Sequence, residues 1–139
     1  VDGLSGEQFA VYAHTLGEVR VLARESVWTI RLASMSFEIF TISAIERGVA
    51  PLGLVDLFNS GGAIIEARFN RHDEYEMLAH NGGKLIIWCA QQPHQVWLSE
   101  EPVTYEYQAA THLLSIHPDQ AAPIVSIRVS FSDTHSTKE

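Results

Sequence analysis

The chain has 139 residues, a hydrophobic share of 46% and a formal net charge of −8. This length fits one folded domain, and this apolar content excludes disorder over most of the chain. The acidic balance, with only Lys84 and Lys138 as lysines, argues against a nucleic-acid partner, because such binding depends on clustered basic residues.

The first third of the chain alternates apolar and polar residues with period two, which predicts strands. Residues 18–21 follow this pattern, and Trp28 alternates with Ile30 and Leu32, which predicts a core position for the indole. Residues 37–45 are apolar on both faces. They predict either a central strand covered on both sides or a strand whose outer face meets another domain.

The run Asn59-Ser60-Gly61-Gly62 is the strongest local signal. A phosphate cradle would need a following Gly-Lys-Ser/Thr and a helix, and the sequence offers neither. We therefore interpret these four residues as a structural loop: a sharp bend with positive φ at its glycines and a side-chain hydrogen bond from Asn59 to the local backbone.

Further strands are predicted over residues 63–69, 74–79, 85–89, 94–99 and 125–131. In the first of them Ala63, Ile65, Ala67 and Phe69 are expected to face the core, whereas residues 85–89 are apolar on both faces. Asn81-Gly82 predicts a tight hairpin turn. Short strands separated by frequent turn residues predict an all-β fold, an antiparallel β-sandwich of about ten to twelve short strands over residues 1–132, followed by a polar, frayed tail at 133–139.

Cys89 is the single cysteine, so no internal disulfide can form. Its apolar surroundings predict a buried structural thiol rather than a nucleophile. The absence of disulfides fits a reducing compartment, and we expect a cytoplasmic location. No stretch reaches the roughly 20 apolar residues of a membrane helix, and no signal peptide is visible, so no membrane partner is expected.

The acids and the seven histidines are the candidates for catalytic groups in this sequence. Glu74 and Glu76 share one face of a strand, as a pair of glycosidase carboxylates would, but the pattern places them on the wet face. No histidines stand at close metal-ligand spacing. The sequence therefore predicts no catalytic residue, no metal and no cofactor in this chain, although distant histidines could still converge in a small stand-alone β-barrel.

A sugar-binding surface is the alternative that the aromatic residues leave open. Trp97 stands between Gln95 and Ser99 on one face of its strand, and an indole beside amides is typical of a platform for a sugar ring. Tyr105 and Tyr107 extend this candidate carbohydrate-binding set. The other interpretations of Trp97 are contact with another domain and ordinary partial burial.

A family resemblance enters at residues 49–64, where an apolar-Ala-Pro-x-Gly-Leu stretch leads to Asn-Ser-Gly-Gly-Ala. This segment closely resembles one near the C-terminus of the raffinose synthase family. Residues 9–14, 37–43, 83–93 and 125–131 resemble that family's flanking strands in the same order. Two departures lie in the turn at residues 99–102, which lacks the usual glycine, and at Trp97, where a polar residue is common.

The resemblance implies a sandwich that follows a (β/α)8 barrel of the glycoside hydrolase family 36 type, the barrel carrying both catalytic aspartates. We thus expect a non-catalytic C-terminal domain whose partner is the catalytic barrel of its own parent, an α-galactosidase or galactosyltransferase. The start at Val1 rather than Met fits a longer parent. A galactoside-binding module is the rival hypothesis, and a bare junction face would make the isolated chain a homo-oligomer.

Overall fold

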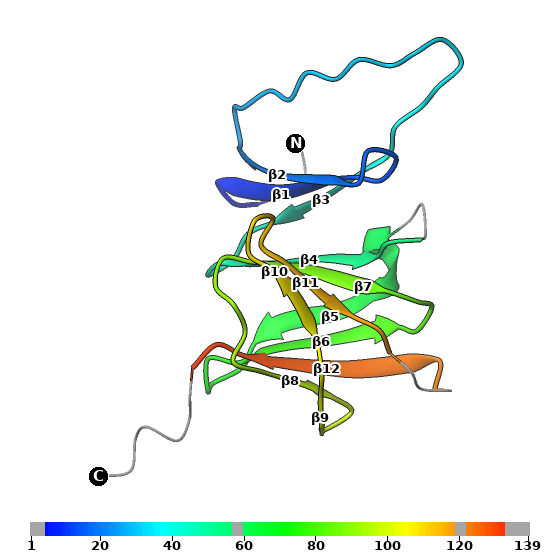
Figure 1. Cartoon of the computed structure of the whole chain (residues 1–139). Helices are drawn as coiled ribbons and strands as arrows, with labels where there is room; N and C mark the ends of the chain where they lie inside the picture. The colour runs from blue at the N-terminus through cyan, green and yellow to red at the C-terminus, as the bar shows by residue number, and fades with distance from the viewer. Residues whose placement is uncertain (1–4, 57–59, 119–121, 133–139) are drawn as a thin grey trace.

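The computed structural model describes residues 5–56, 60–118 and 122–132. Within them, twelve strands form three antiparallel sheets, and the one helical element is a short 3-10 helix, η1 (Ser60–Ala63). Figure 1 shows the sheets stacked as layers. The predicted antiparallel sandwich is confirmed, with a third layer added to it. The expected tail at 133–139 lies outside the described residues.

The three-stranded sheet is built from consecutive strands, whereas the other two sheets combine strands from distant parts of the sequence. The three-stranded sheet has the order β2-β1-β3, with bounds β1 (Gln8–Ala13), β2 (Glu18–Ala23) and β3 (Phe40–Ala44). The four-stranded sheet has the order β10-β11-β7-β4, with bounds β10 (Glu106–Gln108), β11 (Leu113–Ile116), β7 (Leu85–Cys89) and β4 (Val49–Leu54). The five-stranded sheet has the order β5-β6-β12-β8-β9, with bounds β5 (Ile64–Phe69), β6 (Tyr75–His80), β12 (Ile124–Ser130), β8 (Gln95–Leu98) and β9 (Glu101–Val103).

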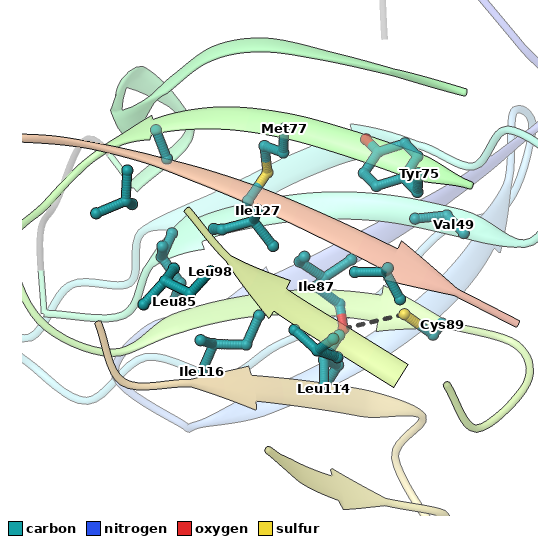
Figure 2. Close-up of a cluster of buried hydrophobic side chains, with 14 of the residues drawn as sticks. Val49, Tyr75, Met77, Leu85, Ile87, Cys89, Leu98, Leu114, Ile116 and Ile127 are labelled. Carbon is teal, nitrogen blue, oxygen red and sulfur yellow. Dashed lines mark hydrogen bonds between the residues drawn. The ribbon is translucent and has the colours of Figure 1, made fainter. Parts of the chain in front are cut away.

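The main core lies between the four-stranded and five-stranded sheets, as Figure 2 shows. Alternate residues of β6, β8 and β12 point inward, as their period-two patterns predicted, and they meet the inner face of β7 and β11. Burial of these side chains is the dominant stabilising contribution, because apolar surface leaves water on folding. The largest fully buried side chains of the main core include Met77, Leu85, Ile87, Leu114 and Ile127.

A second, smaller core joins the three-stranded sheet to the outer face of the four-stranded sheet. Ala10 and Tyr12 of β1 pack there against Leu52, Ile86 and Trp88. Strand β7 is therefore buried on both faces, and all five of its residues are buried. The prediction of a two-sided central strand at 85–89 is confirmed, and the covering layer comes from this same chain.

The interpretation of residues 28–45 needs correction. Strand β3 is an edge strand, and the segment between β2 and β3 contains no strand at all (Figure 1). Trp28 and Ile30 are only half-buried and Leu32 is exposed, so this stretch is not core. Its apolar alternation lacks a second sheet to cover it within the described residues.

Two local predictions also fail. A bulge between Ile64 and Glu66 changes the register of β5 against β6, so Ile64 turns inward and Ile65 is exposed. The Asn81-Gly82 turn does not close a hairpin, because β6 and β7 belong to different sheets. The positive φ of this connection falls on Gly83, where the chain crosses from one layer to the next.

Two of the hairpin turns in the described residues have distinct chemistry. At the β1–β2 turn, the backbone N–H groups of Thr15 and Leu16 donate to the two carboxylate oxygens of Glu38, at 2.8 and 3.0 Å. At the β8–β9 turn, Ser99 and Glu100 both adopt positive φ, at 50° and 69°. Two central residues with positive φ define a type I′ turn, which Asn-Gly fits better than Ser-Glu.

Candidate functional site

The predicted structural loop is built on a close approach between β4 and η1. Gly53 has φ +97°, and a Cβ added to it would lie 1.9 Å from the carbonyl oxygen of Ser60. The buried Ser60 hydroxyl donates to the carbonyl of Leu52 at 2.5 Å. The predicted bend is a 3-10 turn, and its positive φ falls on Gly53 instead of Gly61 or Gly62. Asn59 lies outside the described residues.

The predicted sugar platform lies on the outer face of the five-stranded sheet. Val96 and Leu98 point into the core, so Gln95 and Trp97 share the opposite face of β8, as the alternation predicted. Trp97 is half-buried. The Gln95 amide donates to the carbonyl of Val96 at 3.1 Å, so this side chain already has a partner of its own.

Arg128 occupies one face of the Trp97 ring. The two residues are directly opposite in the β12–β8 register, and the guanidinium carbon lies 3.9 Å from the ring centroid. The same guanidinium donates to Glu74 at 2.9 Å and to Glu100 at 3.4 Å. The Glu74 contact is the stronger one, because Glu74 is buried while Glu100 is largely exposed. Arg128 was not singled out from the sequence, because its importance depends on the strand register.

The two acids considered as a carboxylate pair have structural partners. The Asn70 amide donates to Glu74 at 3.2 Å and to Glu76 at 3.0 Å, and its carbonyl accepts from the backbone N–H of Glu74 at 3.0 Å. The expectation of a wet face is wrong for Glu74, which Arg128 and Asn70 cover, and correct in direction for the half-buried Glu76. A hollow of about 270 Å³ lies beside them, over β5, β6 and β12.

The two tyrosines of the predicted carbohydrate-binding set lie away from Trp97. The Tyr105 hydroxyl donates to the carbonyl of Pro93, and the Tyr107 hydroxyl donates to the carbonyl of Cys89 at 2.8 Å. Both rings pack against the main core. Since the one Tyr107 proton is already used, Nδ1 of His112 is the donor in their 3.1 Å contact. Of the four residues in the predicted carbohydrate-binding set, the structure brings together only Gln95 and Trp97.

His14 and Cys89 have structural roles in the fold. His14 bridges two sheets: Nδ1 donates to the carbonyl of Val55 at 3.2 Å, and Nε2 accepts from the Thr41 hydroxyl at 2.7 Å. Burial raises the pKa of the Cys89 thiol to about 12, so the thiol is inert. In the part of the chain that the structure describes, no three His, Cys, Asp or Glu side chains are grouped as metal ligands.

Comparison with known proteins relates this architecture to one family. The family described as "Raffinose synthase or seed imbibition protein Sip1" matches residues 3–117, which include β1 to β11 and the Gly53–Ser60 contact. The chain belongs to this family. The resemblance drawn from residues 49–64 is thereby confirmed, and it extends over most of the sandwich.

Curated relatives come from plants. Two Arabidopsis thaliana proteins, probable galactinol–sucrose galactosyltransferases 1 and 6, are 26% and 29% identical over 114 and 117 residues, which is 76% and 80% of this chain. A galactinol–sucrose galactosyltransferase of Oryza sativa subsp. japonica is 21% identical over 117 residues. The matched part is only 15–16% of each relative's own length.

None of the described segments forms a helix with the length and apolarity that crossing a membrane requires.

Proposed function

We propose that this chain is a non-catalytic β-sandwich domain that supports the (β/α)8 catalytic barrel of a raffinose-synthase-like or α-galactosidase-like enzyme. The family membership and the small share of each relative that the chain spans support this role. The barrel itself is what the resemblance to glycoside hydrolase family 36 implies. The domain's contribution would be to stabilise and position that barrel.

The distribution of exposed apolar side chains carries this proposal. Eleven large hydrophobic residues of the described chain are exposed, and eight of them lie on the three-stranded sheet, its turns and the segment between β2 and β3. Exposed apolar patches of this kind mark interaction surfaces. We call this set the apolar edge: Leu16, Val21, Val27, Leu32, Met35, Phe37, Phe40 and Ile42.

A groove on the outer face of the three-stranded sheet continues the apolar edge. It has a volume of about 210 Å³, and Phe9, Val11, Phe40 and Ile42 form part of its wall. Trp28 closes one side, with its ring edge-to-face on Phe40 at 5.5 Å and the Arg20 guanidinium 4.4 Å from its centroid. We assign this face to the junction with the barrel, because buried Phe9 and Val11 lie at the groove and the exposed side chains around it are apolar.

Two measurements test the proposal. The isolated chain should give no turnover of a chromogenic α-galactoside above buffer, and light scattering should find a dimer or larger species through the bare apolar edge. Replacing Phe37 and Met35 by serine should reduce this association, whereas Ile65→Ser, a change at an exposed apolar residue of β5 outside the apolar edge, should not. Clear hydrolysis would contradict the non-catalytic role. A clean monomer at high concentration would contradict an apolar junction.

The second proposal is a galactoside-binding module centred on Trp97. The pairing of Gln95 and Trp97 on one open face favours it, while Arg128 on one ring face leaves only the other for a sugar. Titration with galactose and raffinose should then quench tryptophan fluorescence saturably, and Trp97→Ala should abolish the change. Unchanged quenching in Trp97→Ala would refute this site.

A further inference from the structure

A polar groove opens where the four-stranded sheet extends past the three-stranded sheet. Strand β1 packs on β4 and β7, but the outer face of β10 and β11 continues beyond that cover. The step between the two layers encloses about 410 Å³. Its polar walls come from Tyr12, Lys84, Glu106, Gln108 and Ser115, and Ile86 lies at its base.

Strand register builds the floor of this groove. Glu106 is directly opposite Ser115, and Ser115 is directly opposite Ile86, so these three side chains form one row across β10, β11 and β7. The next row on the same face carries Gln108, Leu113 and Trp88. Each row therefore places hydrogen-bonding groups beside apolar surface, on a framework fixed by backbone hydrogen bonds.

Four of the five polar wall residues have side chains that are not committed elsewhere, whereas the Gln108 side chain accepts a hydrogen bond from the Thr111 hydroxyl at 2.8 Å. The Tyr12 hydroxyl, the Lys84 amine, the Glu106 carboxylate and the Ser115 hydroxyl make no hydrogen bond or ion pair with another described residue. Burial, with added repulsion from Asp56 and Glu38, raises the pKa of Tyr12, so its hydroxyl remains a donor at neutral pH. The groove thus offers free donors and free acceptors together.

We propose that this groove binds a neutral polyhydroxylated ligand, a sugar or cyclic polyol. Among the wall residues, the one ammonium and the one carboxylate cancel in net charge, and the carboxylates of Asp56 and Glu38 act on Tyr12 from outside the lining and disfavour an anion. Hydroxyl groups, which both donate and accept, match its mixed lining, and the C–H face of a ring would lie on Ile86 and Leu113. The volume falls within the roughly 300–1,000 Å³ of small-molecule sites.

This site differs from the Trp97 surface and from the apolar edge. It lies on the outer face of the four-stranded sheet, whereas Trp97 faces outward from the five-stranded sheet. It also does not depend on the proposed barrel, because all of its walls belong to this chain. Failure of either earlier proposal would leave this one standing.

NMR titration of the labelled chain with raffinose, myo-inositol and sodium phosphate tests the proposal. Backbone amides of residues 84–86, 106–108 and 113–115 should shift together and saturate with raffinose or myo-inositol, and not with phosphate. Tyr12→Phe, which keeps the buried ring, and Glu106→Gln should each raise the dissociation constant about three- to tenfold, as expected for one lost hydrogen bond. Ser115→Ala should do the same, and Ser126→Ala, on the outer face of β12, should not.

Three results would overturn the proposal. Saturable shifts confined to Gln95–Leu98 would move sugar binding to the Trp97 surface. Binding of phosphate alone would identify Lys84 as an anion contact. The absence of any saturable shift with either neutral probe in the millimolar range would show that the groove holds only water.

Discussion

The backbone of Gly53 lies against the carbonyl of Ser60, and this contact locks β4 to η1. A methyl group at Gly53 would approach that oxygen to 1.9 Å, at a backbone φ of +97° that L-residues rarely adopt. Gly53 belongs to the Ala-Pro-x-Gly-Leu stretch and Ser60 to Asn-Ser-Gly-Gly. Their close contact gives a steric reason for a glycine at position 53.

Gly53→Ala should therefore destabilise the fold severely. Positive φ costs an alanine about 1–2 kcal/mol, and forcing β4 away from η1 costs about 1–3 kcal/mol more. Urea unfolding should report a loss of about 2–5 kcal/mol. Gly17→Ala is the matched control, because φ is +68° there but nothing lies within 4 Å of an added Cβ. Equal losses at both positions would show that the Ser60 contact is unimportant.

Arg128→Lys should separate the contribution of the guanidinium–Trp97 stacking contact from that of the positive charge. Lysine keeps the positive charge but loses the planar contact with Trp97 and the donor geometry toward Glu74, which should cost about 1–2 kcal/mol of unfolding free energy. Arg68→Lys should stay within about 0.5 kcal/mol, because the Arg68 ion pairs are long and exposed. Similar stabilities of the two variants by chemical unfolding would contradict a role for the stack.

The double change Ser99→Asn and Glu100→Gly should stabilise the domain. Both residues hold positive φ in a two-residue turn, so Asn-Gly relieves strain, while the exposed Glu100–Arg128 contact that is lost is worth little. We expect a net gain of about 1 kcal/mol in thermal or urea unfolding. Glu100→Gln, which removes the same charge and retains the strain, should give no gain.

Glu38 should stabilise the β1–β2 turn in a pH-dependent way. Desolvation acts to raise the pKa of its carboxyl, but hydrogen bonds from the backbone N–H groups of Thr15, Ile39 and Leu16 outweigh this and lower it below 4.5. A lowered folded pKa means that the stabilisation is fully present above the unfolded pKa and is lost as the pH falls through the folded one. Glu38→Gln should therefore lower the unfolding midpoint at pH 7, and the difference from wild type should shrink below about pH 4.5. A difference that does not change with pH would contradict the carboxylate's role.

Cys89 should be unreactive until the domain unfolds. Its side chain is fully buried, and burial raises the pKa of its thiol to about 12, so almost no thiolate exists at pH 8. A disulfide-exchange reagent should detect no thiol in the native protein and one thiol in denaturant. Rapid native labelling would show that the core of the four-stranded and five-stranded sheets opens readily.

Alternation was enough to predict much of the sandwich. The inward faces of β6, β8 and β12 and the double-sided burial of β7 follow from residue type alone, because a strand turns successive side chains to opposite faces. Residues 28–32 show the limit of this reasoning. Their alternation has no sheet to cover it, so the same pattern that predicts a core strand elsewhere leaves Leu32 in solvent.

The amino-acid sequence by itself determined the class of fold, the inert thiol and the family, because all three depend on local pattern and composition. Only the tertiary structure decided which strands meet, since pairing joins residues far apart in the chain. That pairing places Arg128 on Trp97 and buries Glu74, and the packing of one sheet on the next brings Tyr12 to one groove with Glu106 and Ser115. The tertiary structure also decided that the positive φ of the loop motif falls on Gly53. The backbone of Ser60 in η1 comes so close to Gly53 that no side chain fits there.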